Sequence, residues 1–407
     1  MTPVRKAFGR ILASAVLGGA LVAATTTTAG AADDILSGVD RTLRQTAARI
    51  LATATPGEPL EVVTTTRTSA GPRIISSIAS TPEQALDLIA AGLSRSSTIG
   101  VDMAHPVQID ITNDTYRSQQ WALTRFGAES LWRTSSGSGV VVAVIDTGVR
   151  AWHPDLRRQV RKGYDFVDPG TSAMDANGHG THVAGIIAAL AGNRQGIAGL
   201  ARSAQILPVR VLDASGSGDT ADVARGIVWA ADHGANVINL SLGSSWSDSA
   251  GKAAVEYAQS KNILVVAAAG NSGCGLLLGS PTSYPAAYAG VVGVGAIDAN
   301  GSTASYSSCG SWVDVMAPGS RIISTMVETP DSSLGCQPRY CYLSGTSMAT
   351  PYAAAAAALE IAHLGRGWRA STVRSLMQST ADDIGSRGYD TRTGNGVINP
   401  RRMLAAR

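Results

Sequence analysis

Two histidines three residues apart raise the first chemical question. His179 and His182 lie in the segment DANGHGTHVAG, which spans residues 175–185 and is otherwise rich in small residues. On a helix, side chains with this spacing project from one face, as the ligands of a metal site do. A general base, by contrast, needs one imidazole and a group that orients it. Both kinds of site are compatible with the pair alone.

Two other segments carry groups that a histidine base can use. Asp146 directly follows the apolar run Val140–Ile145, which places it at the end of a buried strand. Ser347 lies in a tight turn before an alanine-rich stretch that predicts a helix. Taken singly, Asp146 is explained as a turn residue and Ser347 as a helix cap. Together with a histidine, they supply a nucleophile, its base and the group that orients the base.

The elements expected around these residues alternate between strands and helices. Short β-branched runs predict buried strands, and the longer stretches between them predict helices. This alternation is typical of a parallel sheet with helices on both faces, whose ligands bind beyond the carboxyl ends of the strands. The expected strands are Val140–Ile145, Ile206–Val211, Val237–Leu240, Ile263–Ala267 and Val291–Val294, and the expected helices are Val183–Leu190, Ala221–Asp232 and Ser249–Gln259.

The stretch from residue 32 to about residue 110 has a different pattern. Apolar residues recur at helical spacing over 36–50, and a second helix is expected to start at Thr81, with Pro82 first and Gln84 completing a capping box. Short strands are expected at 61–67, 73–78 and 99–103. The pattern predicts a small α+β unit that shows no chemistry of its own.

The first 31 residues predict a secretory signal peptide. A basic start is followed by the apolar stretch Ile11–Ala24, and the small residues at 29–31 offer a cleavage site. A membrane anchor is the alternative, but about 14 apolar residues are too few for a span that needs ~20. We therefore expect a soluble, secreted protein that acts outside the cell.

Composition and cysteine content narrow the function classes. The 407 residues are 44% hydrophobic and 15% charged, which favours a packed core over disorder. A net charge of +3 indicates neither nucleic acid nor a membrane surface as a partner. Four cysteines in an exported chain favour two disulfides over a zinc site, with three possible connectivities. We favour Cys274–Cys309 with Cys336–Cys341, which closes one longer and one short loop.

Five motifs point to a known family. The segments VVAVIDTG, DANGHGTHVAG, NLSLG, AAAGN and LSGTSMATP follow one another at plausible spacings. In this order they resemble the subtilisin-like serine proteases, the subtilases of peptidase family S8, from about Gln119 to the C-terminus. The resemblance is to the secreted bacterial type. It implies an α/β fold, a three-layer sandwich around a mostly parallel sheet, in agreement with the expected alternation of elements.

The resemblance also implies catalytic roles. Ser347 matches the nucleophile, His179 the base and Asp146 the residue that orients the base. Asn271, at the end of AAAGN, matches a donor to the oxyanion of the tetrahedral intermediate, although a Gly-Asn turn is its ordinary explanation. The backbone N–H of Ser347 is the expected second donor. His182 is then expected to be a packed structural residue, a zinc role for the pair is not expected, and catalysis needs no cofactor.

Substrate contacts are implied to come from small residues and the backbone. The segment Leu212–Gly218 matches an edge strand that pairs with an extended substrate through main-chain hydrogen bonds. Without an acidic cluster beside these segments, we expect broad endopeptidase activity with an apolar or medium-sized residue before the cleaved bond. The expected substrate-binding residues are Ser215, Gly216, Ser241, Leu242, Gly243, Ala268, Ala269 and Gly270, with the base of the pocket near Ser283.

Structural calcium and a departure from the family pattern complete the site predictions. Asp155 and Asn193 match a family calcium site, and Asp314 matches a second, although each is also an ordinary turn or surface residue. The family commonly has a histidine two residues after the threonine of its serine motif, where this chain has Tyr352. Packing behind the serine is therefore expected to differ.

The sequence as a whole predicts a monomeric serine endopeptidase made as a zymogen. The expected domains are a signal peptide at 1–31, a propeptide at 32–110 and a subtilisin-like peptidase domain at 111–407. By resemblance, the upstream unit is an inhibitory propeptide that assists folding and is removed autocatalytically between about residues 100 and 118; an accessory domain is the alternative. Protein substrates and this propeptide are the expected partners. A narrow-specificity maturation protease and an inactive binding protein on the same fold are the alternative functions.

Overall fold

The computed structural model describes residues 45–47, 60–103, 112–275, 279–328, 336 and 339–406. The chain divides into two compact units, Met1–Ile109 and Asp110–Arg407. The expected signal peptide and most of the expected helix over 36–50 lie outside the described residues. Within the described part of the chain, no helix is long and apolar enough to cross a membrane.

The first unit is a three-stranded antiparallel sheet on which a helix packs. Its strands are β1 (Leu60–Thr68), β2 (Gly71–Ala79) and β3 (Thr98–Met103), in the order β2-β1-β3. Helix α3 (Pro82–Leu93) begins where the sequence predicted, because Thr81 accepts a hydrogen bond from the Gln84 N–H and the Gln84 side chain accepts one from the Ser80 N–H. The unit is therefore α+β, with a small core of its own.

The second unit is built on a seven-stranded sheet in which all the neighbouring strands are parallel. Four of its strands lie within one residue of the predicted runs, and the strand predicted at Val291–Val294 begins one residue later and extends to Ile297. The two outer strands were not predicted, because one has only two residues and the other is a four-residue segment ending in proline. Across the sheet the order is β10 (Val315–Pro318), β9 (Val292–Ile297), β8 (Leu264–Ala268), β7 (Val237–Leu240), β4 (Val141–Asp146), β6 (Gln205–Arg210) and β5 (Tyr164–Asp165).

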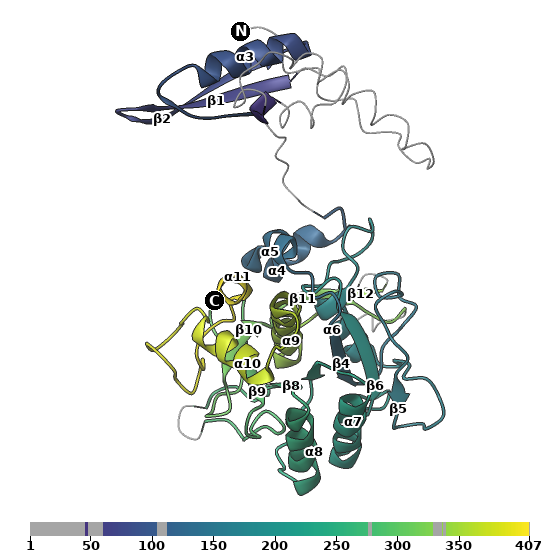
Figure 1. Ribbon diagram of the computed structural model, residues 1–407. Helices are drawn as coiled ribbons and strands as arrows, with labels where there is room; N and C mark the ends of the chain where they lie inside the picture. The colour runs from purple at the N-terminus through teal and green to yellow at the C-terminus, as the bar shows by residue number, and fades with distance from the viewer. Residues whose placement is uncertain are drawn as a thin grey trace. The chain divides into compact units, whose positions relative to one another are not determined.

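Helices cover both faces of this sheet, which gives three layers (Figure 1). On one face lie α7 (Thr220–Asp232) and α8 (Ser249–Ser260), and on the other lie α6 (His179–Ala188) and α9 (Thr346–Leu364). Side chains of β4 alternate between the two cores: Val142 and Val144 pack with α6 and α9, whereas Ala143 and Ile145 pack with α7 and α8. Because both faces are buried, the strand sequences are continuously apolar.

Shorter elements close the ends of the second unit. A two-stranded antiparallel ribbon, β11 (Ile322–Thr325) and β12 (Tyr340–Leu343), leads directly into α9. Disulfides join Cys274 to Cys309 and Cys336 to Cys341, the pairing favoured from the sequence. The remaining helices are η1 (Arg117–Gln119), α4 (Trp121–Phe126), α5 (Ala128–Thr134), α10 (Ala370–Ser379) and α11 (Pro400–Ala405).

Candidate active site

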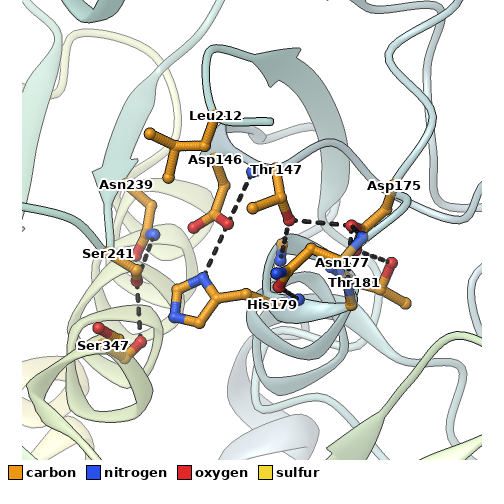
Figure 2. A network of polar contacts seen from close by, with 12 residues as sticks. Asp146, Thr147, Asp175, Asn177, His179, Thr181, Leu212, Asn239, Ser241 and Ser347 are labelled. Carbon is orange, nitrogen blue, oxygen red and sulfur yellow. Dashed lines mark hydrogen bonds and ion pairs between the residues drawn. The ribbon is translucent and has the colours of Figure 1, made fainter. Parts of the chain in front are cut away.

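The carboxyl end of β4 and the first residue of α6 bring Asp146 and His179 together. The Nδ1 atom of His179 lies 2.7 Å from Oδ1 of Asp146, a hydrogen-bonding distance (Figure 2). The close approach depends on Gly180, because a Cβ there would lie 2.2 Å from the carbonyl oxygen of Gly148 and 3.1 Å from Cβ of Asp146. The glycine after His179 is thus a steric requirement of this contact.

Charge and burial act in opposite directions on His179. Burial favours the neutral imidazole and is the largest single influence. The charge of Asp146, its hydrogen bond and the charge of Asp175 outweigh it, so the pKa of His179 lies above its ordinary value. Asp146 itself is fully buried, and its Oδ1 also accepts the N–H of Thr147 at 2.8 Å. The arrangement favours an imidazolium whenever the ring takes up a proton.

Ser347 lies in the first turn of α9, on the side of His179 away from Asp146 (Figure 2). Its carbonyl oxygen accepts the hydroxyl of Ser241 at 2.8 Å, and that hydroxyl in turn accepts the amide of Asn239 at 3.0 Å. No hydrogen bond joins the Ser347 hydroxyl to His179 among the described residues. Such bonds are often long in free enzymes and tighten when substrate binds. The second ring nitrogen of His179 faces the side on which Ser347 lies.

The amide of Asn271 is held in one orientation beside this serine. Its Oδ1 accepts hydrogen bonds from the N–H of Thr346 at 2.8 Å and from the Thr346 hydroxyl at 3.0 Å. The Nδ2 group therefore remains available as a donor. A Cβ on Gly345 would lie 3.5 Å from this Nδ2 and 3.6 Å from the backbone nitrogen of Ser347, so the glycine keeps the space beside both donors open.

Two adjoining hollows surround these residues. A groove of 640 Å³ is lined by His179, by the segment 215–220 and by residues 241–244. A smaller pocket of 220 Å³ reaches Ser347 and Asn271 and is lined by Ala268, Gly270 and Ser283. Of the predicted substrate-binding residues, Ala269 alone lines neither hollow; it is fully buried, and its carbonyl accepts the indole N–H of Trp312.

Aromatic residues that no sequence motif indicated form a wall of the larger groove. Trp246, Tyr284 and Tyr288 line it, and 79% of the Trp246 surface is exposed. None of the three belongs to a recognisable motif, although Trp246 follows Gly243 by three residues and therefore lies close to a predicted wall of the pocket.

His182 lies away from the candidate catalytic contacts. Its Nε2 atom lies 3.1 Å from the carbonyl oxygen of Ile322 and 3.0 Å from that of Cys341, so it ties α6 to the β11–β12 ribbon. Complete burial lowers the pKa of His182 to about 3, which keeps the ring neutral. This environment agrees with the expected structural role.

Of the predicted calcium ligands, Asp155 and Asn193 lie together. Asp155 is fully buried, and its carboxylate accepts hydrogen bonds from the Asn193 amide, the Ile197 N–H and the Tyr340 hydroxyl. Asp114, which was not predicted, accepts the backbone N–H groups of residues 192 and 193 in the same loop and adds a second negative charge near Asp155. Two neighbouring carboxylates and an amide oxygen are ligands that Ca²⁺ accepts, although no cluster of three or more His, Cys, Asp or Glu residues is present among the described residues.

Asp314 has a different environment. Its carboxylate accepts hydrogen bonds from the guanidinium of Arg374, the amide of Gln378 and the N–H of Gly293. These donors already neutralise and occupy the carboxylate. The residues around Asp314 therefore do not fit a cation site.

The fold and this geometry are typical of a hydrolase of the serine peptidase class, with the candidate residues at the carboxyl edge of a parallel sheet. Residues 137–396 match the model of the subtilase family, peptidase S8. The chain is 47% identical over 293 residues to thermitase from Thermoactinomyces vulgaris. The aligned region covers 72% of this chain and 98% of thermitase. It is 44% identical over 284 residues to subtilisin Savinase from Lederbergia lenta, and this alignment covers 70% of this chain and 97% of that protein.

Solved structures agree with the sequence comparison. A protease from Pseudoalteromonas arctica PAMC 21717 superimposes with a TM-score of 0.65 and 34% identity, over 73% of this chain and 99% of that one. A cold-adapted subtilisin-like serine proteinase gives a TM-score of 0.55 and 36% identity, over 65% of this chain and 88% of the other. The chain belongs to the subtilase family and is a serine endopeptidase that acts on proteins.

Proposed function

We propose that the chain cleaves peptide bonds through Asp146, His179 and Ser347, with Asn271 as an oxyanion donor. The observation that carries this assignment is the 2.7 Å contact between His179 and a carboxylate that is fully buried. A buried carboxylate holds the ring in the tautomer with its proton on Nδ1, and this leaves Nε2 free to accept a proton.

The groups act in sequence on an extended substrate. The Ser347 hydroxyl attacks the peptide carbonyl carbon while its proton passes to Nε2 of His179, and Asp146 stabilises the imidazolium without taking the proton. The Asn271 amide and the Ser347 N–H donate to the oxyanion of the tetrahedral intermediate. His179 then protonates the departing amine, leaving an acyl-enzyme that water hydrolyses by the same steps.

Broad specificity and zymogen maturation belong to the same proposal. The groove is open and its edge, at 215–218, consists of glycine and serine, which favours main-chain recognition of many sequences. The small α+β unit upstream acts as an inhibitory propeptide, and the protein is secreted as a monomer. A protease that matures one partner is the second candidate, favoured only by the large exposed Trp246 on the groove wall.

The variant Ser347→Ala tests the catalytic assignment. Activity of the full secreted chain on denatured proteins should fall by about 10⁶-fold, because the nucleophile is removed. Ser375→Ala, an exposed serine on α10, serves as the matched control and should keep wild-type activity. Ser347→Ala protein that digests the substrates at the wild-type rate would exclude Ser347 as the nucleophile.

Intact mass of the same proteins tests maturation. Wild type and Ser375→Ala should lose the upstream unit, whereas Ser347→Ala should retain it. Loss of the unit from Ser347→Ala as well would mean that another protease removes it. A panel of unrelated denatured proteins separates broad activity, in which all are digested, from narrow activity, in which one partner alone is cleaved.

A further inference from the structure

A second buried carboxylate lies beside the candidate catalytic pair. Asp175 is 1% exposed and belongs to the loop before α6. Its Oδ1 accepts the N–H groups of Asn177 and Gly178, and its Oδ2 accepts both the N–H and the hydroxyl of Thr181, at 2.6–2.9 Å. All of these donors are uncharged. A carboxylate buried among neutral donors is costly unless its hydrogen bonds are well made, so the arrangement calls for an explanation.

One part of the explanation is the start of α6. The N-cap of this helix is Gly178, which has no side chain to accept the free N–H groups of the first turn. Asp175 supplies the missing acceptor by binding the N–H of Thr181. A negative charge at this end of a helix is also favoured by the helix dipole. Asp175 therefore fixes the turn of chain that carries His179.

The other part is a direct link to Asp146. The hydroxyl of Thr147 donates to Oδ1 of Asp175 at 2.9 Å and accepts the N–H of Gly180 at 3.0 Å. The backbone N–H of Thr147 donates to Oδ1 of Asp146 at 2.8 Å. Figure 2 shows the resulting continuous network, in which one carboxylate holds the turn after β4 on one side and the first turn of α6 on the other.

We propose that Asp175 is a positioning residue of the active site, which acts through Thr147 and the start of α6 to keep Asp146 and His179 in hydrogen-bonding geometry. The inference rests on the proposed roles of those two residues. Asp175 touches neither substrate nor the reacting atoms; it contributes geometry through its hydrogen bonds and, separately, a negative charge near the imidazole.

These two contributions are separable by mutation. Asp175→Asn removes the charge and places an NH₂ group against backbone N–H donors, either those of Asn177 and Gly178 or that of Thr181, so it disturbs both geometry and charge. Thr147→Val removes the hydroxyl that links Asp175 to the turn after β4 but leaves the charge of Asp175 in place. Thr147→Ser keeps the hydroxyl and is the conservative rescue. Asp165→Asn is the matched control, because Asp165 is equally buried but pairs with Arg210 at the far edge of the sheet.

The charged groups that act on His179 set the expected pH behaviour. They are Asp146 from β4 and Asp175 from the loop before α6, while His182 on the next turn of α6 is neutral. Each carboxylate raises the pKa of His179. The base works in its neutral form, so removal of the Asp175 charge should move the acid limb of kcat/KM to lower pH.

The experiment is steady-state kinetics on a short chromogenic peptide, with active sites counted by a serine-directed irreversible inhibitor. Asp175→Asn should lower kcat per active site by about 10–100-fold with little change in KM, since small displacements of reacting groups carry costs of this size. Its acid limb should shift to lower pH. Thr147→Val should lower kcat without shifting the acid limb. Thr147→Ser, which keeps the hydroxyl, should have a kcat close to that of the wild type.

A merely structural role predicts a different result. In that case Asp175→Asn would resemble Asp165→Asn, with reduced thermal stability but unchanged kcat per active site and an unchanged acid limb, and the proposal would be wrong. If Asp175→Asn yields no enzyme whose active sites react with the inhibitor, the Thr147→Val variant tests the proposal instead. A wild-type kcat in Thr147→Val overturns the proposal. Failure of the proposed function itself is recognised separately, by activity that survives in Ser347→Ala.

Discussion

At the scale of single residues, hydrogen bonds fix the orientation of the Asn271 side-chain amide in the candidate site. The Oδ1 atom of Asn271 accepts two hydrogen bonds from Thr346, and reversing the amide would place its NH₂ group against the backbone N–H of Thr346, which can only donate. Each bond contributes about 1 kcal/mol, so the reversed amide is rare. The donor is thus oriented before substrate arrives, which is the condition for stabilising charge that develops only during the reaction.

This orientation predicts the effect of Asn271→Ala. The variant should lower kcat by about 10²–10³-fold with little change in KM, because the lost hydrogen bond forms chiefly in the transition state. Kinetics on the chromogenic peptide provide the measurement, with Asn300→Ala in the exposed loop 298–302 as the control that should change neither constant. A kcat of Asn271→Ala within threefold of wild type would exclude Asn271 as an oxyanion donor.

At the scale of elements, α9 carries the proposed nucleophile on a helix that the core surrounds. Residues 348–361 of this helix are all buried, which explains why that part of the helix shows no polar face. Glu360 breaks this rule: it is fully buried, and within the described part of the chain neither carboxylate oxygen has a hydrogen-bond partner. Burial raises the pKa of Glu360 to about 7.

The raised pKa predicts a pH-dependent cost at Glu360. Between the ordinary carboxyl pKa and about 7, the folded chain holds a proton that the unfolded chain releases, so this group destabilises the fold increasingly as pH rises through that window. Glu360→Leu should therefore raise the free energy of unfolding more at pH 8 than at pH 5, by about 1–3 kcal/mol.

Chemical denaturation in a Ser347→Ala background measures this difference without self-digestion. Glu360→Gln keeps the shape of the side chain but cannot ionise. Like Glu360→Leu, it should change the free energy of unfolding more favourably at pH 8 than at pH 5. Glu256→Gln is the control, since Glu256 is 62% exposed on α8 and should show no such trend. An equal gain from Glu360→Leu at both pH values would contradict the prediction.

At the scale of the whole molecule, cross-links and loops frame the site. One disulfide joins Cys274, three residues after Asn271, to Cys309, and the other joins Cys336 to Cys341 in the ribbon that leads to α9. Asp155, which binds the amide of Asn193, also contacts this ribbon through the hydroxyl of Tyr340. A cation bound between Asp155 and Asn193 would therefore stabilise the peptidase unit as a whole.

We accordingly expect calcium to raise thermal stability. Removal of Ca²⁺ from the Ser347→Ala protein should lower Tm by several degrees, since a ligand at 100 times its Kd stabilises by about 2.7 kcal/mol. Asp155→Asn should abolish the dependence on calcium, whereas Asp314→Asn should retain it because Asp314 pairs with Arg374. Thermal unfolding with and without chelator tests this, and identical Tm values for the parent protein would show that no stabilising site exists.

The sequence by itself determined the family, the layered fold and the four residues proposed to do the chemistry. Buried parallel strands appear as continuous apolar runs, and the motifs that follow them are local in the chain, so both are visible without coordinates. Five strands and the capped start of α3 were predicted on this basis. The outer strands β5 and β10 were missed because one has only two residues and the other is a short segment that ends in proline.

Only the tertiary structure decided how distant residues meet. Helix α6 begins at His179, four residues before the predicted start at Val183. Its first turn is capped by the side chain of Asp175, because the N-cap residue, Gly178, has no side chain. Asp175 and Thr147 are 28 residues apart, and Asn271 and Thr346 are 75 apart. A hydrogen bond between residues so far apart in the sequence depends on which segments the fold brings close together. Local spacing therefore pointed to the groups proposed to react, whereas the contacts that orient them required the folded chain.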